Sequence, residues 1–213
     1  MTDAIAHLRE FITAEGRNLG NGILKVDALI NHQIQPGVMQ AFGQIFADRF
    51  ASQSPTRILT AEVSGIAPAV FTAQVLGVPV VYARKKKPVT MSGRVYMAVA
   101  ESRTKGGSNE LVVSAEFLHA DDRVLVIDDF LARGKTSAAL LQLVREAGAT
   151  PIGYGCLVEK QFEGGRQYLR DNGFADIPIE ALASIIHMDD SKITLADRGA
   201  VFRDRGSNRM PPT

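Results

Sequence analysis

The stretch VLVIDDFLARGKTS, residues 124–137, decides the fold and most of the chemistry of this chain. It begins with an apolar run at residues 124–127, of the kind found in strands whose sheet is covered on both faces. Two carboxylates, Asp128 and Asp129, end the run, and Gly134 then marks the turn into a helix. The stretch therefore predicts a buried strand that carries an acid pair to the rim of a sheet, followed by a loop and a helix.

The loop behind the acid pair has the composition of a phosphate site. Backbone N–H groups at the start of a helix, expected here over residues 136–147, point at an anion, and the helix dipole attracts it. Thr136 and Ser137 add hydroxyl donors, while Arg133 and Lys135 add positive charge. Because carboxylates repel a phosphate, we expect the acid pair to face ribose hydroxyls instead, with a magnesium ion nearby.

Two other interpretations of this stretch compete with a ribose-phosphate site. Residues 134–136 end like a P-loop, but that motif needs a glycine where Asp129 stands, and the acid pair would then meet the phosphates. An exposed turn without any ligand is the simpler alternative. The ordered succession of strand, acid pair, glycine, hydroxyls and helix argues against it, because a plain turn requires none of that order.

Composition excludes several classes of protein. The 213 residues include 24 Lys and Arg against 23 Asp and Glu, a net charge of +1, so any site for an anionic partner must be local. With 46% hydrophobic residues the chain has enough apolar material to fold, which excludes intrinsic disorder. The amino end does not resemble a signal peptide, and no stretch of about 18 apolar residues occurs. Together with a single cysteine, Cys156, this pattern predicts a cytoplasmic protein.

Strand and helix patterns alternate along the rest of the chain. Strands separated by crossover helices predict an α/β fold with a mostly parallel sheet flanked by helices. Ligands of such sheets bind outside the carboxyl ends of the strands, so polar residues just after the strands are the candidate site. We expect helices at 3–14, 36–50, 66–76 and 166–172, strands at 58–61, 78–83 and 151–158, and an antiparallel pair at 93–100 and 110–115.

At residues 128–137 the chain resembles the phosphoribosyl diphosphate (PRPP) signature of the type I, or purine/pyrimidine, phosphoribosyltransferases. Over roughly residues 1–190 it is similar to the bacterial xanthine phosphoribosyltransferases of that family. LKVD at residues 24–27 and NHQ at residues 31–33 carry the likeness to the xanthine enzymes, with SGIAPAV at 64–70 and VEK at 158–160. The resemblance implies the type I fold, with a small hood formed by the N- and C-terminal segments and a flexible flap.

The resemblance also implies an activity and a site. The activity is purine salvage, in which the phosphoribosyl group of PRPP is transferred to N9 of xanthine to give xanthosine monophosphate (XMP) and pyrophosphate. Magnesium is expected to bind with PRPP, and the family is usually homodimeric. By similarity, Ala132 to Thr136 hold the 5′-phosphate, and the acid pair faces the ribose as the catalytic residues. Leu24, Asn31 and Lys160 form the xanthine site.

Two further segments are candidates for pyrophosphate binding. Ser64 and Gly65 lie in a turn after a strand, where backbone N–H groups can take anionic oxygens, although a plain turn is an equal alternative. Arg84 and Lys85 begin a basic run between a strand and the flap, and a solvated loop is the alternative there.

The base-site residues have ordinary alternatives as well. A lysine such as Lys160 is more often a solvated surface charge, Asn31 could be a turn or helix cap, and Leu24 could be core packing. The chain also departs from the family at the phosphate loop, where Arg133 and Lys135 replace the common asparagine and glutamine. The added charge should strengthen phosphate binding and could slow product release.

Two other functions remain possible on this fold. An adenine phosphoribosyltransferase shares the central motifs, but Lys160 is a pure hydrogen-bond donor and would face the 6-amino donor of adenine. A PRPP-sensing regulator that binds DNA would need a basic recognition module, and the first predicted helix opens with the acidic Asp3.

The four histidines lack metal-ligand spacing, so no metal site is expected in the protein itself. We expect one domain over residues 1–200, a mobile tail at 201–213, and no nucleic-acid or membrane partner.

Overall fold

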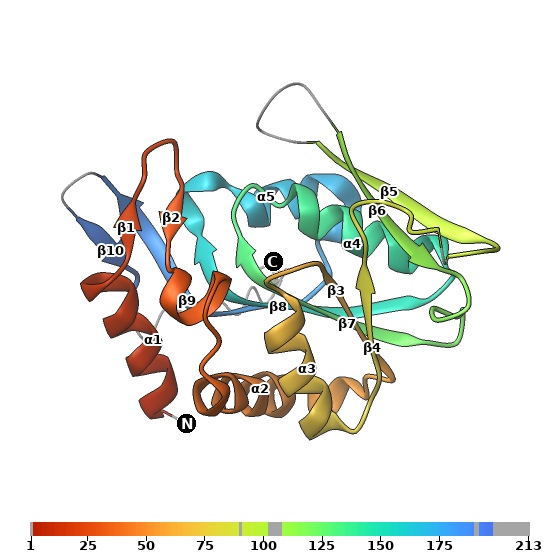
Figure 1. The fold of residues 1–213 in the computed structure, drawn as a ribbon, viewed down its shortest axis with the longest axis horizontal. Coiled ribbons are helices and arrows are strands. Elements are labelled where there is room, and N and C mark those ends of the chain that lie inside the picture. The colour runs from red at the N-terminus through yellow and green to blue at the C-terminus, as the bar shows by residue number, and fades with distance from the viewer. Residues whose placement is uncertain (1, 90, 102–107, 190–191, 198–213) are drawn as a thin grey trace, which may run out of the picture.

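The computed structural model describes residues 2–89, 91–101, 108–189 and 192–197. At its centre is a six-stranded sheet in the order β10-β9-β8-β7-β3-β4 (Figure 1). Strands β3, β4, β7, β8 and β9 run parallel, and β10 runs antiparallel to β9, which confirms the predicted α/β class. The strands are β3 Arg57–Ala61, β4 Val80–Ala83, β7 Arg123–Leu131, β8 Thr150–Lys160, β9 Ile179–Met188 and β10 Ile193–Leu195.

Helices cover both faces of this sheet (Figure 1). Strand β7 shows why its sequence is continuously apolar: Leu125 and Ile127 belong to one core cluster, and Val124 and Val126 belong to the other. The first cluster contains the buried side chains of α1, α2 and α3, and the second contains those of α4 and α5. These helices are α1 Thr2–Ala14, α2 Pro36–Phe50, α3 Ile66–Leu76, α4 Lys135–Glu146 and α5 Gly165–Leu169.

Helix boundaries agree with the predicted ones to within a residue or two for the first four helices. Pro36 occupies the first turn of α2, where its missing N–H is not needed, and Phe42, Phe46 and Phe50 of the same helix are buried. Helix α3 ends at Gly77, whose left-handed backbone (φ 70°) suits a residue without a Cβ. Local sequence signals therefore set where these elements start and stop.

Two small hairpins extend from the sheet (Figure 1). Strands β5 Val95–Glu101 and β6 Ser108–Ser114 are antiparallel, as predicted for the flap, and backbone hydrogen bonds of 2.8 and 2.9 Å between Arg84 and Val112 tie them to β4. The other hairpin is β1 Arg17–Asn18 with β2 Leu24–Lys25. It follows α1 in the chain, and α1 packs against β9 and β10. We refer to these N- and C-terminal segments as the hood. Irregular turns include a π-helix at Asp27–Asn31, 3-10 turns at Ala51–Gln53 and Gln161–Glu163, and a kinked turn at Arg170–Phe174 whose backbone is not helical at Asn172 and Gly173.

Some features differ from the sequence predictions. Strand β7 does not stop at Ile127 but continues to Leu131, because its parallel pairing with β8 continues, with Asp128 opposite Cys156 and Phe130 opposite Val158. Strands β9 and β10 were not predicted. The expected tail at 201–213 lies outside the described residues, and the single-domain assignment stays a prediction. None of the described helices is long and apolar enough to cross a membrane.

Candidate active site

A cavity of about 720 Å³ opens at the carboxyl ends of β3, β7 and β8, in the size range of small-molecule sites. Four parts of the chain form most of its wall: the hood between Leu19 and Asn31, the turn between β3 and α3, the segment 128–137, and the end of β8 with the turn after it. The flap strands contribute Ala100 and Leu111. This is the place that the parallel-sheet rule predicts.

Nearly all predicted site residues lie together on the wall of this cavity. They are Leu24, Asn31, Ser64, Gly65, Lys85, Asp128, Asp129, Ala132, Arg133, Gly134, Lys135, Thr136 and Lys160. Arg84 does not line it. Its side chain lines a second cavity of about 430 Å³ beside β4, and its Nε lies 2.6 Å from Oε2 of Glu62.

The acid pair is buried more deeply than a rim position implies. Asp128 is 5% exposed, since it lies within β7 and not after it. Burial raises the pKa of the Asp128 carboxyl, and the neighbouring charge of Asp129 raises it further. The backbone N–H of Asp129 donates to Oδ1 of Asp128 (3.0 Å), and that of Phe130 donates to Oδ1 of Asp129 (2.9 Å). Two carboxylates are thus held side by side at the cavity floor.

Gly65 allows the turn after β3 to approach this pair. A Cβ at Gly65 would lie 2.8 Å from Oδ1 of Asp128, closer than real side chains come. The turn at Glu62 to Gly65 therefore packs directly on the acid pair only because position 65 has no side chain. Its backbone faces the same cavity.

The phosphate loop has the geometry of a helix N-terminus. Gly134 is the N-cap of α4 with φ 78°, a left-handed conformation that favours glycine, and α4 begins at Lys135, one residue earlier than predicted. A Cβ at Gly134 would lie 2.7 Å from the carbonyl oxygen of Gly165. The loop 132–136 therefore rests on the backbone of the segment that follows β8, and its first-turn N–H groups lie at the cavity.

A buried hydroxyl relay supports this loop from behind. Ser137 donates to the hydroxyl of Tyr154 (2.9 Å), and that hydroxyl donates to the carbonyl oxygen of Phe130 (3.3 Å). The hydroxyl hydrogen of Ser137 is thus directed into the protein in this arrangement. Burial raises the pKa of Tyr154, with the charge of Asp128 as the next cause, so Tyr154 stays a neutral donor.

The two polar residues of the predicted base site are both held by protein contacts. Lys160 is 8% exposed; its Nζ donates to the carbonyl oxygen of Gly22 (2.6 Å) and lies 5.2 Å from the centre of the Phe130 ring. Nδ2 of Asn31 donates to Oγ of Ser64 (3.1 Å) and to Oδ2 of Asp129 (3.0 Å). Because a carboxylate oxygen accepts, these bonds fix the amide, and Oδ1 of Asn31 is left as the acceptor.

Several lining residues gave no clear signal in the sequence. Phe130 directly follows the acid pair, which could have marked it, but Glu163 and Gly22 lie in segments with no recognisable motif. Glu62 accepts from the backbone N–H of Lys85 (2.8 Å), which lies 23 positions away in the sequence, and it also pairs with Arg84. Contacts of this kind could not be predicted from the sequence, because they depend on which strands pair in the sheet.

Comparison with known proteins identifies relatives over most of the chain. The family model of the phosphoribosyl transferase domain matches residues 27–191. A xanthine phosphoribosyltransferase of Deinococcus deserti is 54% identical over 192 residues, which is 90% of this chain and 98% of that protein. The enzyme of the same name from Listeria monocytogenes is 48% identical, over 87% of this chain and 95% of its own length.

Solved structures share the fold. An adenine phosphoribosyltransferase of Rhodothermus marinus has a TM-score of 0.70 at 21% identity, covering 87% of this chain and all of that one. The enzyme from Trypanosoma brucei, solved with AMP, pyrophosphate and ribose-5-phosphate, has a TM-score of 0.63 at 25% identity, with 83% and 75% of the two chains covered. The family match, the relatives and the fold agree, and the chain belongs to the phosphoribosyl transferase domain family.

Proposed function

We propose that this chain transfers the 5-phosphoribosyl group of PRPP to N9 of xanthine, giving XMP and pyrophosphate in purine salvage. The relatives at about half identity over nearly the whole chain, all named xanthine phosphoribosyltransferases, carry this assignment. The cavity supports it, because one hollow holds an anion-binding helix start, an acid pair, a basic residue from the flap side and two polar groups suited to a purine edge.

In this proposal PRPP spans three parts of the cavity wall. The first-turn N–H groups of the loop 132–136 take the 5′-phosphate, assisted by the charges of Arg133 and Lys135. The acid pair receives the ribose hydroxyls. Pyrophosphate binds at the turn of Ser64 and Gly65 and at the side chain of Lys85. Arg84 would act on pyrophosphate only indirectly, because it pairs with Glu62, and the carboxylate of Glu62 accepts a hydrogen bond from the backbone N–H of Lys85.

The reaction is a displacement at C1′ of the ribose. A bond from N9 of the base to C1′ forms while the bond from C1′ to the pyrophosphate oxygen breaks, and the sugar gains positive character in between. The proton that the imidazole ring of the base loses passes to water. Negative charge on the acid pair favours that character, and cationic and N–H donors stabilise the leaving anion. No side-chain nucleophile is required.

Base selection follows from donor and acceptor types. Lys160 presents N–H donors, and Asn31 presents Oδ1 as an acceptor, so the pair suits an edge with a carbonyl oxygen next to an N–H. Xanthine has such edges. The amino group of adenine would set a donor against the lysine, which supports xanthine over adenine even though the similar solved structures are adenine enzymes.

Magnesium is proposed to enter with PRPP. The cavity floor offers carboxylate oxygens of Asp128 and Asp129, the hard ligands that this ion prefers. The described residues contain no group of three or more His, Cys, Asp and Glu side chains that could hold a metal by itself. Substrate oxygens and water would therefore supply most of the ligands, and the ion would neutralise charge on the leaving pyrophosphate.

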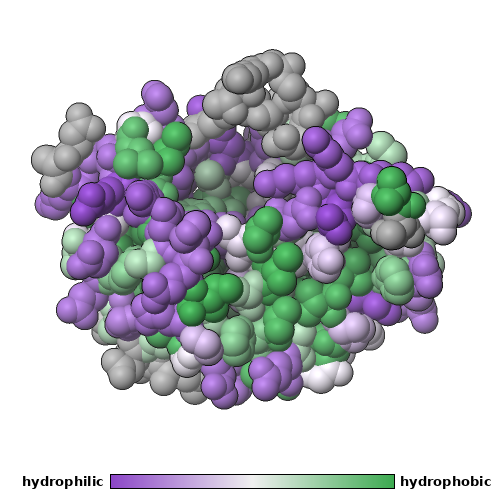
Figure 2. Space-filling model, in the orientation of Figure 1, coloured by the Kyte–Doolittle hydropathy of each residue, from purple (hydrophilic) through white to green (hydrophobic). Residues whose placement is uncertain are grey.

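A homodimer is proposed as the assembly. Helix α3 contains no charged residue, yet Val70 and Val75 on it are 45% and 40% exposed, and Val63 before it is 73% exposed. Figure 2 shows apolar surface in the middle of this face, over α3. A second copy covering it would also bring the exposed Lys86 and Lys87 near a neighbouring molecule.

The single, buried Cys156 suits a reducing compartment, and we propose the cytoplasm.

The test is a purine competition assay with PRPP and magnesium present. Xanthine, guanine, hypoxanthine and adenine are supplied in turn, and nucleotide and pyrophosphate release are followed. We expect the highest kcat/KM for xanthine. Faster turnover of any other purine would refute the substrate assignment, and tight PRPP-dependent DNA binding without turnover would refute the proposal that the chain is an enzyme.

Sedimentation of the wild type and V70E tests the proposed homodimer. A wild-type protein that sediments as a monomer, like V70E, would refute it.

A further inference from the structure

Glu163 is a buried carboxylate between two parts of the cavity. It ends the 3-10 turn that follows Lys160, and its side chain is 4% exposed. Its Oε2 lies 3.4 Å from Nε of Arg133, in the phosphate loop, and its Oε1 lies 3.7 Å from Nζ of Lys160, in the base site. One carboxylate thus contacts a cation from each of two substrate subsites.

The backbone around Glu163 is packed against the phosphate loop. The close approach of Gly134 to Gly165 leaves no room for a side chain at either position, since a Cβ at Gly165 would collide with the carbonyl of Ala132. On the far side, Arg166 donates to both carboxylate oxygens of Glu159, at 2.7 and 3.0 Å. The turn after β8 therefore cannot shift independently of the loop that precedes α4.

The two cations around Glu163 differ in freedom. The Lys160 side chain is 10% exposed and bonded to the Gly22 carbonyl, whereas the Arg133 side chain is 52% exposed. A buried carboxylate needs a nearby cation, because burial without one is costly. If Arg133 is removed, Glu163 loses one of these cations and its attraction for Lys160 becomes stronger.

We infer that Glu163 is a positioning residue that links the 5′-phosphate and xanthine subsites through Arg133 and Lys160. This inference rests on the proposed function and extends it. With Arg133 in place, Glu163 is shared and Lys160 stays directed at the base. Without Arg133, Lys160 is drawn toward Glu163, and the affinity for xanthine falls although Arg133 does not touch the base. Contacts of this kind make the effects of two substitutions non-additive.

A double-mutant cycle tests the inference. KM for xanthine, KM for PRPP and kcat are measured for the wild type, R133Q, E163Q and the double variant. R133Q is expected to raise KM for xanthine about fivefold in the wild-type background, and by less than twofold when E163Q is also present. An equal rise in both backgrounds, or no rise in either, would overturn the inference.

Matched variants separate positioning from general damage. R133K keeps the charge that faces Glu163, so its KM for xanthine is expected within twofold of the wild-type value; a rise as large as that of R133Q would overturn the link. This comparison does not depend on E163Q folding. E146Q, at an exposed position of α4, is the control glutamate and should leave the R133Q effect at fivefold. Absence of xanthine turnover in the wild type would refute the proposed function instead.

Discussion

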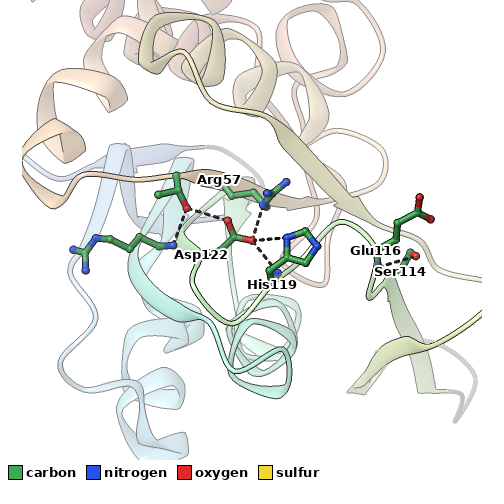
Figure 3. A network of polar contacts seen from close by, with 7 residues as sticks. Arg57, Ser114, Glu116, His119 and Asp122 are labelled. Atoms are coloured by element: carbon green, nitrogen blue, oxygen red, sulfur yellow. Dashed lines mark hydrogen bonds and ion pairs between the residues drawn. The ribbon is translucent and has the colours of Figure 1, made fainter.

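Strand β7 places one buried aspartate near each of its ends, and the two have opposite environments. Asp122 directly precedes the strand and is 6% exposed, while Asp128 lies near its carboxyl end and is 5% exposed. At Asp122 the carboxylate accepts from Nε of Arg57 (2.7 Å), Oγ1 of Thr56 (3.0 Å) and the backbone N–H of His119 (2.9 Å) (Figure 3). At Asp128 the main charged neighbour is the carboxylate of Asp129, and the opposing effect of Lys85 is smaller.

The pKa values record this contrast. Burial raises the pKa of Asp122, but the hydrogen bonds from His119, Arg57 and Thr56 outweigh it and leave the pKa below its usual value. Burial raises the pKa of Asp128, and the charge of Asp129 adds to the rise. At similar burial, the ionised carboxylate therefore stabilises the fold at Asp122 and opposes it at Asp128. The destabilised end is the one that lines the cavity.

Loss of the acid at the cavity should have the largest effect. D128N is expected to lower kcat at least 100-fold, because the ribose loses a charged partner in the transition state. The free energy of unfolding should be unchanged or higher at neutral pH, since the amide removes a buried like-charge contact and keeps the acceptor for the Asp129 N–H. Steady-state kinetics and urea unfolding measure both. A clear loss of stability would show that Asp128 is structural.

The reverse pattern is expected at the other end of the strand. D122N should lower the free energy of unfolding by about 2 kcal/mol, because it leaves the largely buried Arg57 without its countercharge. KM and kcat at a temperature where the variant is folded should stay within twofold of wild type. D121N, at the exposed neighbouring aspartate, is the control and should match wild type in both assays.

The dependence of stability on pH should separate the two acids by sign. A lowered folded pKa means that the stabilisation from Asp122 is present above the unfolded pKa, about 3.9, and is lost as the pH falls through the folded value. A raised folded pKa means that wild type loses stability relative to D128N as the pH rises from about 3.9 through the folded value of Asp128. Unfolding of wild type, D122N and D128N from pH 3 to 8 measures these differences. If the stability of wild type relative to each variant changed with pH in the same direction for both, the comparison would be contradicted.

The smallest effects on stability and kinetics are expected from a substitution in the hydroxyl relay of Ser137 and Tyr154. Y154F removes the hydroxyl that accepts from Ser137 and donates to the Phe130 carbonyl, and should lower the free energy of unfolding by about 1 kcal/mol. Because the relay holds the first turn of α4, KM for PRPP should rise two- to threefold with kcat little changed. Thermal unfolding and initial-rate kinetics measure the two quantities. A rise in KM for xanthine alone would contradict this role.

The agreement between sequence and structure depends on how local each signal is. The apolar run and Gly134 predicted a strand and a helix start, and the structure has both. The acid pair was predicted at the rim of the sheet; it lines the cavity, but Asp128 lies within the strand and is buried. The end of β7 was placed too early, since Asp128 is a poor strand former and its pairing with β8 could not be seen locally. Strand β9 was missed because IEALASIIHM fits a helix nearly as well as a strand.

The sequence by itself determined the fold class, the family and many of the residues around the cavity, because strand ends, caps and glycine turns are properties of short segments. Tertiary structure decided the electrostatics. Thr56 and Arg57 reach Asp122 across 66 and 65 positions, and Asn31 reaches Asp129 across 98 positions. The contact of Arg133 with Glu163 likewise joins separate segments, so none of these contacts is marked by spacing along the chain. Burial and charge neighbours are set by which strands pair and which turns meet, so the tertiary structure decides which acid stabilises the fold and which opposes it.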